Sequence, residues 1–166
     1  MQGYIFRKAT IDDIEKLKLI GLNSFGNFKD QLTEDNWEKL KNYLTGENTY
    51  PELLNQSTCF VCEHANEVIG MAFLFSRGNP TDIFQEDWSY LRMVGVNAAY
   101  AGKGLGRRLI EVCIDHARTT GEKTIALHTS EFMDAARHLY EDMGFNQVRE
   151  LPSRLGKKYW LYRLEL

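Results

Sequence analysis

The sequence predicts an α/β fold in which one mixed β-sheet is flanked by helices. Strand-like and helix-like segments alternate along the 166 residues, which is the pattern of helices packed on a sheet. The helical segments each carry one apolar face. No internal repeat, low-complexity segment or linker divides the chain, and its length suits one sizeable core. We therefore expect a single domain over residues 1–166.

The first predicted elements are a strand and a helix. Residues 3–10 alternate well enough for a strand, and Thr10 with Asp13 resembles a capping box that starts a helix at once. We expect glycine and asparagine within residues 21–31 to end this helix.

The middle of the chain should supply a second helix and a hairpin. The helix is predicted from about Thr33, and residues 45–57 are expected to form a loop or a short helical turn. Residues 58–76 contain two β-rich runs, which predict an antiparallel hairpin around residues 64–67.

The second half alternates strands and helices before it closes with two strands. In order, the predicted elements are a strand over 88–96, a glycine loop, a helix from Leu105 to Gly121, a buried strand over 123–129, a helix over 134–143, and strands over 146–151 and 157–166. Gly144 stands where a left-handed helix C-cap belongs. The last strand looks exposed, so it could pair with a second subunit and form a homodimer.

Composition narrows the classes of partner. The net charge is −3 at pH 7, and the pI is about 5.8, which argues against a nucleic-acid partner because such proteins need a basic face. No apolar run approaches the length of a membrane span, so we expect no membrane partner. The chain has no signal peptide and an odd number of cysteines, which predicts a cytoplasmic location.

The cysteines suggest no metal site. Cys59 and Cys62 form a C-x-x-C within a predicted strand, where that separation puts the two thiols on opposite faces. No second pair of ligands completes a zinc site. We expect both to pack in the core or face solvent, and Cys113 to lie on the apolar side of its helix.

A glycine loop between a strand and a helix is the strongest candidate for a binding site. Its three alternating glycines are Gly102, Gly104 and Gly106, and its cations are Lys103, Arg107 and Arg108. A Walker loop would need a hydroxyl at residue 104, and a dinucleotide fingerprint would need glycine at residue 107. Bare amides at a helix N-terminus still predict a site for an anion such as pyrophosphate. The alternative is a tight turn that binds nothing.

Two stretches resemble the signature motifs of the GNAT family of N-acetyltransferases. Residues 94–118, VGVNAAYAGKGLGRRLIEVCIDHAR, are similar to the cofactor-binding motif of that family, and residues 128–145, HTSEFMDAARHLYEDMGF, are similar to its second signature. Residues 6–17 and the order of elements also match. The resemblance implies a GNAT fold and transfer of an acetyl group from acetyl-CoA to a primary amine by direct attack, without a metal. The acceptor would be a small molecule or a peptide.

The resemblance also implies which residues bind the cofactor. They are Val94, Gly95, Val96, Ala101, Gly102, Lys103, Gly104, Leu105, Gly106, Arg107, Met133 and Ala136. The family motif usually has Gln or Arg where Ala101 stands, although the Ala101 amide could still donate, and many members carry Asn where Met133 stands. In the family, the strand before the loop splays from its neighbour, and the pantetheine arm lies in the gap.

Gly95 lies within the predicted strand and predicts a bulge or a close backbone approach there. Free backbone groups near Val94 and Val96 would then bind the pantetheine amides. The alternative is a glycine that only relieves crowding in a buried strand.

Tyr140 matches the general acid of the family, and its alternative role is packing in the core. A phenol stays protonated at neutral pH and can donate to a departing thiolate. The strand before the loop lacks the Glu that often serves as base. His128 is the preferred substitute, and the other candidates are Glu63, His64, Glu86 and Asp87.

The family's acceptor contacts correspond here to residues 25–32 and 151–158. A group of acidic residues could attract a cationic amine or could be a solvated surface: Asp30, Glu34, Asp35, Asp82, Glu86 and Asp87. The strand before the loop lacks the usual Glu, and Ala101 replaces the usual Gln or Arg of the family motif. These two departures leave a second interpretation open, in which the chain is a non-catalytic acyl-CoA-binding regulatory module.

Overall fold

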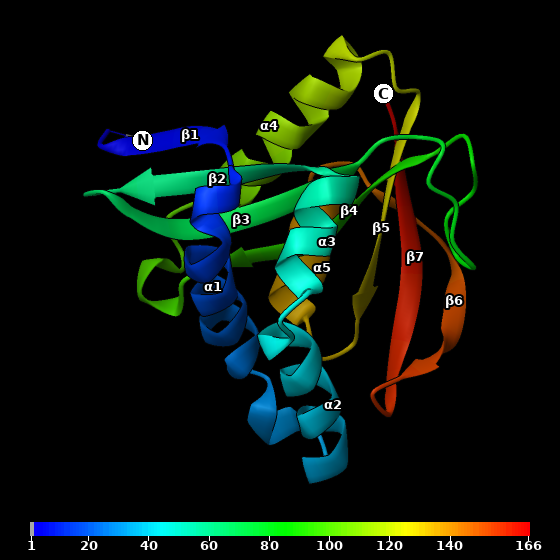
Figure 1. Ribbon diagram of the computed structural model, residues 1–166. Coiled ribbons are helices and arrows are strands. Elements are labelled where there is room, and N and C mark those ends of the chain that lie inside the picture. Colours follow the sequence, from blue (N-terminus) through cyan, green and yellow to red (C-terminus); the bar gives the residue numbers. More distant parts are fainter. Residues whose placement is uncertain (1) are drawn as a thin grey trace.

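A seven-stranded mixed sheet with helices on both faces organises the chain (Figure 1). The computed structural model describes residues 2–166. The strand order is β1-β2-β3-β4-β5-β7-β6. The strands are β1 (Tyr4–Lys8), β2 (Thr58–His64), β3 (Glu67–Phe75), β4 (Ser89–Val96), β5 (Thr124–Ser130), β6 (Asn146–Arg154) and β7 (Lys157–Glu165). The helices are α1 (Ile14–Gly26), α2 (Glu34–Thr45), α3 (Thr49–Gln56), α4 (Leu105–Thr119) and α5 (Asp134–Asp142). The predicted fold class is confirmed.

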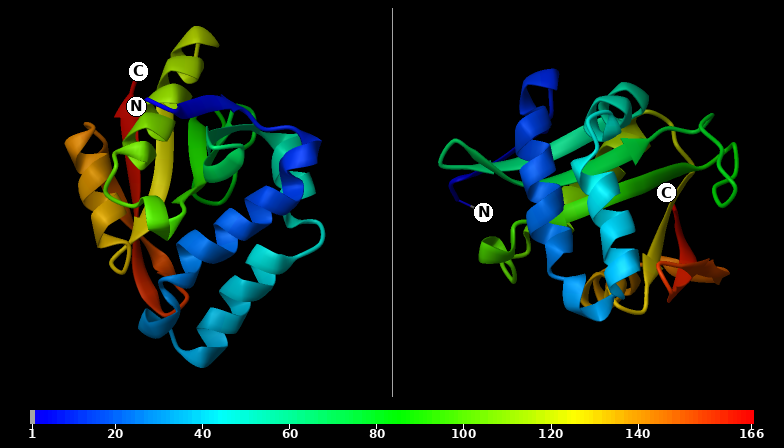
Figure 2. Two further views of the ribbon diagram at one scale, coloured as in Figure 1. Left: turned by 90° about the vertical axis from the view of Figure 1, so that its left-hand side faces the viewer. Right: turned by 60° about the horizontal axis from the view of Figure 1, so that its bottom comes forward.

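The sheet separates two apolar cores. Helices α1 and α3 pack on one face of it, with α2 against them, and α4 and α5 pack on the other face (Figure 2). Cys59 belongs to the first core and Cys62 to the second, so the predicted opposite orientation of the two thiols is confirmed. Both are buried, as is Cys113, which rules out a solvent-side role. Burial raises the pKa of Cys62 to about 11, so this thiol is protonated at neutral pH.

The predicted end of the first helix is wrong. Helix α1 continues through Gly21 and ends at Gly26. A Cβ on Gly21 would lie 2.0 Å from the hydroxyl oxygen of Tyr50, so this glycine makes room for a tyrosine of α3 that is 1% exposed. Burial of that ring outweighs the low helix propensity of glycine, which is worth about 1 kcal/mol. Residues 49–56 lie in the segment predicted as a loop or a short helical turn. They form the eight-residue helix α3, because burial of Tyr50 and Leu53 stabilises it.

The predicted hairpin, the start of the second helix and the C-cap at Gly144 agree with the structure. Strands β2 and β3 are joined through Ala65 and Asn66, both with positive φ, as in a two-residue hairpin turn. Thr33 caps α2 by accepting a hydrogen bond from the Asn36 amide. Gly144, at φ 97°, follows α5, and the Phe145 amide donates to the Tyr140 carbonyl, which completes a left-handed C-cap.

The predicted subunit contact through the last strand is wrong. Strand β7 pairs with β5 along one side and with β6 along the other, so its backbone groups are already used. The edges of the sheet are β1 and β6. No helix within residues 2–166 is both long and apolar enough to cross a bilayer.

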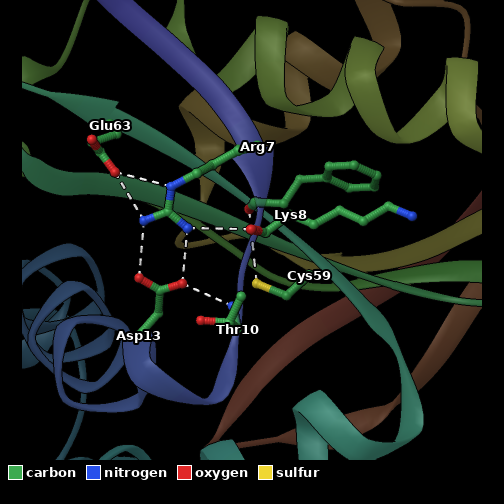
Figure 3. A network of polar contacts seen from close by, with 7 residues as sticks. Arg7, Lys8, Thr10, Asp13, Cys59 and Glu63 are labelled. Atoms are coloured by element: carbon green, nitrogen blue, oxygen red, sulfur yellow. Dashed lines mark hydrogen bonds and ion pairs between the residues drawn. The ribbon is translucent and has the colours of Figure 1, made fainter.

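An ion-pair network fixes the start of α1 to the sheet (Figure 3). Arg7 of β1 donates from Nη1 and Nη2 to the Asp13 carboxylate at 2.9 and 3.0 Å, and from Nε to Glu63 at 2.9 Å. The Thr10 amide also donates to Asp13, at 2.8 Å, which supplies one half of the predicted capping box. The bonds from Arg7, together with the Thr10 amide, hold the pKa of Asp13 at about 2, below its usual value.

The ion-pair network around Asp13 predicts that the folded protein loses stability in acid. Because the folded pKa of Asp13 is depressed, its contribution to the unfolding free energy is complete above about pH 4 and is lost as the pH falls toward 2. We expect Asp13→Asn to lower the unfolding free energy at pH 7 by about 2 kcal/mol and to flatten its pH dependence between pH 4 and 2. Urea denaturation at several pH values measures this. Asp12→Asn is the control, and an equal loss in both variants would contradict the account.

Candidate functional site

Strands β4 and β5 separate after two paired residues. Their parallel pairing joins Ser89 to Ile125 and Tyr90 to Ala126 and extends no further, and the two strands then diverge (Figure 1). The expected splay is therefore present. Beyond Tyr90, the backbone of β4 on this side has no neighbouring strand to satisfy it.

A bulge in β4 accompanies this separation. Arg92 pairs with Phe73 of β3, but Gly95 pairs with Met71, so two residues of β4 stand opposite one residue of β3. Met93, within the bulge, has φ 54°, a strained value for a residue with a side chain. The bulge therefore centres on Met93.

Gly95 itself serves packing. A Cβ at Gly95 would lie 2.5 Å from Ser24 Oγ of α1, so its predicted close approach is confirmed as contact with a helix. The alternative that we stated for Gly95, relief of crowding in a buried strand, describes it best.

A cavity of about 600 Å³ lies at the opening between the two strands. Its volume is in the range of small-molecule sites. The elements around it are β4, β5, the end of α1, α2, α5, the loop before β4, and the β6–β7 turn with Tyr159 of β7. Five of the residues predicted as catalytic or cofactor-binding line it: Val94, His128, Met133, Ala136 and Tyr140. The last three lie three and four residues apart, so α5 presents one face to the cavity.

Tyr140 lines the cavity from a buried position. It is 7% exposed, and its ring lies 5.8 Å from that of Phe145 in a T-shaped arrangement. Burial raises the pKa of the phenol well above its usual value. The hydroxyl is therefore protonated at neutral pH, as a proton donor must be.

His128 lines the same cavity in a neutral form. Burial, with the charges of Arg154 and Arg92, lowers the pKa of His128 to about 4. Its Nε2 lies 3.4 Å from Arg154 Nη1, and its buried Nδ1 has no hydrogen-bond partner within residues 2–166. Because an arginine can only donate, Nε2 accepts this bond and the neutral ring carries its proton on Nδ1, which is free to donate to a ligand.

The glycine loop lies outside the lining of this cavity, beside α5. Gly102 and Gly104 have φ near +75°, and Gly104 is the N-cap of α4. The first helical bond runs from the Arg108 amide to the Gly104 carbonyl, so the amides over 105–107 have no acceptor within the helix. A Cβ on Gly106 would lie 3.8 Å from Leu139 Cδ2 of α5.

The three cations of the loop differ in whether they already form an ion pair. Arg107 pairs with Asp142 of α5, and Arg108 pairs with Glu111. Lys103 lies 5.5 Å from the centre of the Tyr100 ring and forms no ion pair within residues 2–166. It is therefore the cation most available to a ligand at this helix N-terminus.

The Ala101 amide, expected to be able to donate to a ligand, already has an acceptor within the chain. That amide donates to the Ala98 carbonyl at 3.1 Å and closes a 3₁₀ turn. The Ala98 amide in turn donates to Asn23 Oδ1 at 2.8 Å. The start of the loop is thus fixed to α1, and the free amides lie further along it.

The alternative bases predicted from the sequence lie elsewhere. Glu63 belongs to the Arg7 network, and the His64 ring stacks near Tyr4 at the start of the chain. Glu86 and Asp87 are exposed and do not line the cavity. Of the six acidic residues predicted to attract an amine, Asp82 alone lines the cavity within residues 2–166.

Sequence reasoning missed Arg92 and Lys39, which line the cavity together with Tyr43 and Thr129. Arg154 also lines it and lies within residues 151–158, one of the two segments expected to contact the acceptor, and Phe25 and Phe28 of the other segment, residues 25–32, line it as well. Arg92 had a signal that could have been used, because it is a charge within an otherwise apolar predicted strand. Lys39 had none, since it lies on an exposed helix whose position over the opening is set by tertiary structure.

Comparison with known proteins agrees with this geometry. The family model of the acetyltransferase (GNAT) family matches residues 25–145. A relative from Xenopus tropicalis, named "Probable N-acetyltransferase camello", is 30% identical over 116 residues, which cover 68% of this chain and 50% of the relative. The L-amino acid N-acyltransferase MnaT of Escherichia coli is 34% identical over 70 residues, covering 41% of this chain and 40% of MnaT. The chain thus spans about half or less of the length of these two relatives.

Solved structures share the fold over nearly the whole chain. The PaiA N-acetyltransferase of Thermoplasma acidophilum, in complex with coenzyme A, has a TM-score of 0.78 at 13% identity and covers 98% of this chain and 99% of its own. The ribosomal-protein-alanine N-acetyltransferase of Brucella melitensis has a TM-score of 0.73 at 22% identity, with coverage of 98% and 99%. At such identities the likeness concerns the fold. The chain belongs to the acetyltransferase (GNAT) family.

Proposed function

We propose that the chain is an N-acetyltransferase that moves an acetyl group from acetyl-CoA to a primary amine by direct attack. Membership of the family supports an acyltransferase. The observation that carries the proposal is the cavity at the separation of β4 and β5, because the phenol of Tyr140 lines the opening that an extended thioester arm would enter. Acetyl-CoA supplies the thioester, whose carbonyl carbon the amine attacks.

The glycine loop fits the diphosphate of such a ligand. The positive φ of Gly102 and Gly104 turns the chain so that the helix N-terminus is exposed, and a Cβ on Gly102 would meet nothing within 4 Å. The amides over 105–107 and the charge of Lys103 would hold the phosphates. These groups form the anion site, with Arg107 and Ala101 at its margin because their polar groups are already bonded.

The chain beyond the loop would hold the pantetheine arm. The backbone of β4 near Val94 and Val96 faces the gap left by β5 and would bond to the amides of the arm. Met133 and Ala136 line the cavity on the α5 side and would cover the arm with apolar surface. A backbone N–H freed by the bulge at Met93 would donate to the thioester oxygen as negative charge develops on it.

Tyr140 would deliver a proton to the sulfur that leaves. Its pKa is raised by burial, so the phenol keeps its proton until a stronger base forms beside it. A departing thiolate placed in the cavity is such a base in a poorly solvated setting.

His128 would orient the acceptor rather than take its proton. Because its pKa is about 4, the ring is neutral, and its Nδ1–H would donate a hydrogen bond to the acceptor while the amine loses its proton to water.

The role of Tyr140 predicts a selective loss of turnover. We expect Tyr140→Phe to lower kcat by about a hundredfold, the usual worth of general acid catalysis, and to change the CoA dissociation constant by no more than about twofold. Thiol release from acetyl-CoA and calorimetric titration with CoA measure the two effects. Tyr162→Phe is the matched control, since Tyr162 is buried in the same core but bonds to Glu141. Equal rates in Tyr140→Phe and wild type would remove Tyr140 from the reaction.

The anion site predicts that Gly104→Glu abolishes CoA binding. The new side chain brings bulk and negative charge to the helix N-terminus, and we expect the dissociation constant to rise by at least about a hundredfold. Gly121→Glu is the control, because Gly121 also has positive φ but lies beyond the other end of α4. Affinity retained in Gly104→Glu would place the phosphates elsewhere, and CoA binding without turnover on any amine would favour a regulatory module.

A further inference from the structure

We propose that the acceptor amine also carries an anionic group, a carboxylate or a phosphate, and that Arg92 binds this group in the cavity. The proposal rests on the function proposed above and names the class of its acceptor. It depends on the charges of the cavity, not on the residues that would hold acetyl-CoA.

Arg92 is fixed in place at the opening of the sheet. It directly precedes Met93 in β4, and its Nη2 donates to the hydroxyl of Tyr43 of α2 at 2.9 Å. Its guanidinium lies 6.0 Å from the centre of the Tyr43 ring and 5.7 Å from that of Phe75, where cation–π attraction holds it. The side chain is therefore oriented before any ligand arrives.

The charge of Arg92 lacks a protein counterion. No carboxylate within residues 2–166 forms an ion pair with it, although Glu47 and Glu52 line a neighbouring cavity of about 420 Å³ that Arg92 also borders. A guanidinium has five N–H donors, and the bond to Tyr43 uses one. A partly buried cation with open donors is costly unless an anion pairs with it, and the acceptor can supply that anion.

Two more cations line the same cavity. Lys39 of α2 and Arg154 of β6 join Arg92 there, against the single carboxylate of Asp82, and neither Lys39 nor Arg154 forms an ion pair within residues 2–166. The arginines also act on His128 in the wall of the cavity: Arg154 Nη1 lies 3.4 Å from its Nε2, and Arg154 and Arg92 add to burial in lowering the pKa of this imidazole against the opposing effect of Asp82. Of the two alternatives stated for the acidic residues, a solvated surface therefore describes all but Asp82.

Open hydrogen-bonding groups in the cavity also fit a polar ligand. Thr129 Oγ1 and His128 Nδ1 are buried without a hydrogen-bond partner within residues 2–166, and both residues line the cavity. Buried polar atoms are normally bonded. A small acid with an amine offers acceptors to the cations, to the Thr129 hydroxyl and to the Nδ1–H of His128.

The test compares amines that differ only in the anionic group. Each of the twenty standard L-amino acids is paired with its C-terminal amide, and phosphoethanolamine with ethanolamine, in an assay of thiol release from acetyl-CoA. We expect kcat/KM to be at least about tenfold higher for the anionic member of one or more pairs. The amino-acid pairs and the phosphate pair identify which anion is recognised. A preference for the neutral member in every pair that reacts overturns the proposal.

Variants assign the preference to Arg92. We expect Arg92→Met to raise KM for the preferred acid by about ten- to a hundredfold, with a smaller change in kcat, and to leave KM for its neutral partner unchanged. Arg92→Lys, which keeps the charge but loses the planar fork, should fall between. Arg118→Met on the exposed side of α4 is the control. Discrimination that persists in Arg92→Met overturns the proposal. Should Arg92→Met fail to fold, as judged by thermal melting, the Arg92→Lys variant decides the question in the same way.

Binding measurements separate this proposal from the proposed function. Wild-type protein saturated with CoA is titrated calorimetrically with each anionic amine of the panel, which requires no turnover. Binding that Arg92→Met abolishes supports the acceptor class even if no amine reacts. Failure of all of them to bind overturns the acceptor class, whereas failure of CoA itself to bind overturns the proposed function.

Discussion

The bulge at Met93 is the constraint on which the rest of the structure depends. A residue with a side chain held at φ 54° inside a strand is strained, and the strain is tolerated because β3 pairs with β4 on both sides of the bulge. The bulge coincides with the end of pairing between β4 and β5. Without that separation β4 and β5 would stay hydrogen-bonded to each other, and the cavity that Arg92, Val94 and His128 line would not form.

The elements around the opening hold it in one shape. Helix α1 approaches β4 so closely at Ser24 that Gly95 can carry no side chain, which fixes one wall. Helix α5 presents Tyr140 to the cavity and, through Asp142 and Arg107, is tied to the N-terminus of α4. The glycine loop and the cavity therefore share α5 as a common wall, so a ligand held at the proposed anion site would be directed toward the cavity. Helix α2 forms another wall of the same cavity, and its Tyr43 orients Arg92.

Local signals in the sequence were enough to predict most strands, the glycine loop and the helix with Tyr140. Hydrophobic periodicity and turn preferences depend on residues that are close in the sequence, so they can be recognised without knowledge of the fold. Contacts between distant segments were not predictable. From the sequence alone, Gly21 indicates the end of a helix, because its contact with Tyr50 is not visible there. The last strand likewise indicates an edge of the sheet, because its pairing with β6 is not visible. The segment that holds Arg154 was expected at the acceptor site, whereas Lys39 and Arg92 join it there only through the tertiary fold.

A crystal structure of the protein with CoA tests the central claim most directly. We expect the diphosphate on the amides at the start of α4, the pantetheine arm in the gap between β4 and β5, and the sulfur within hydrogen-bonding distance of the Tyr140 hydroxyl. Phosphates bound away from residues 102–107, or a gap closed by continued pairing of β4 with β5, would contradict the account.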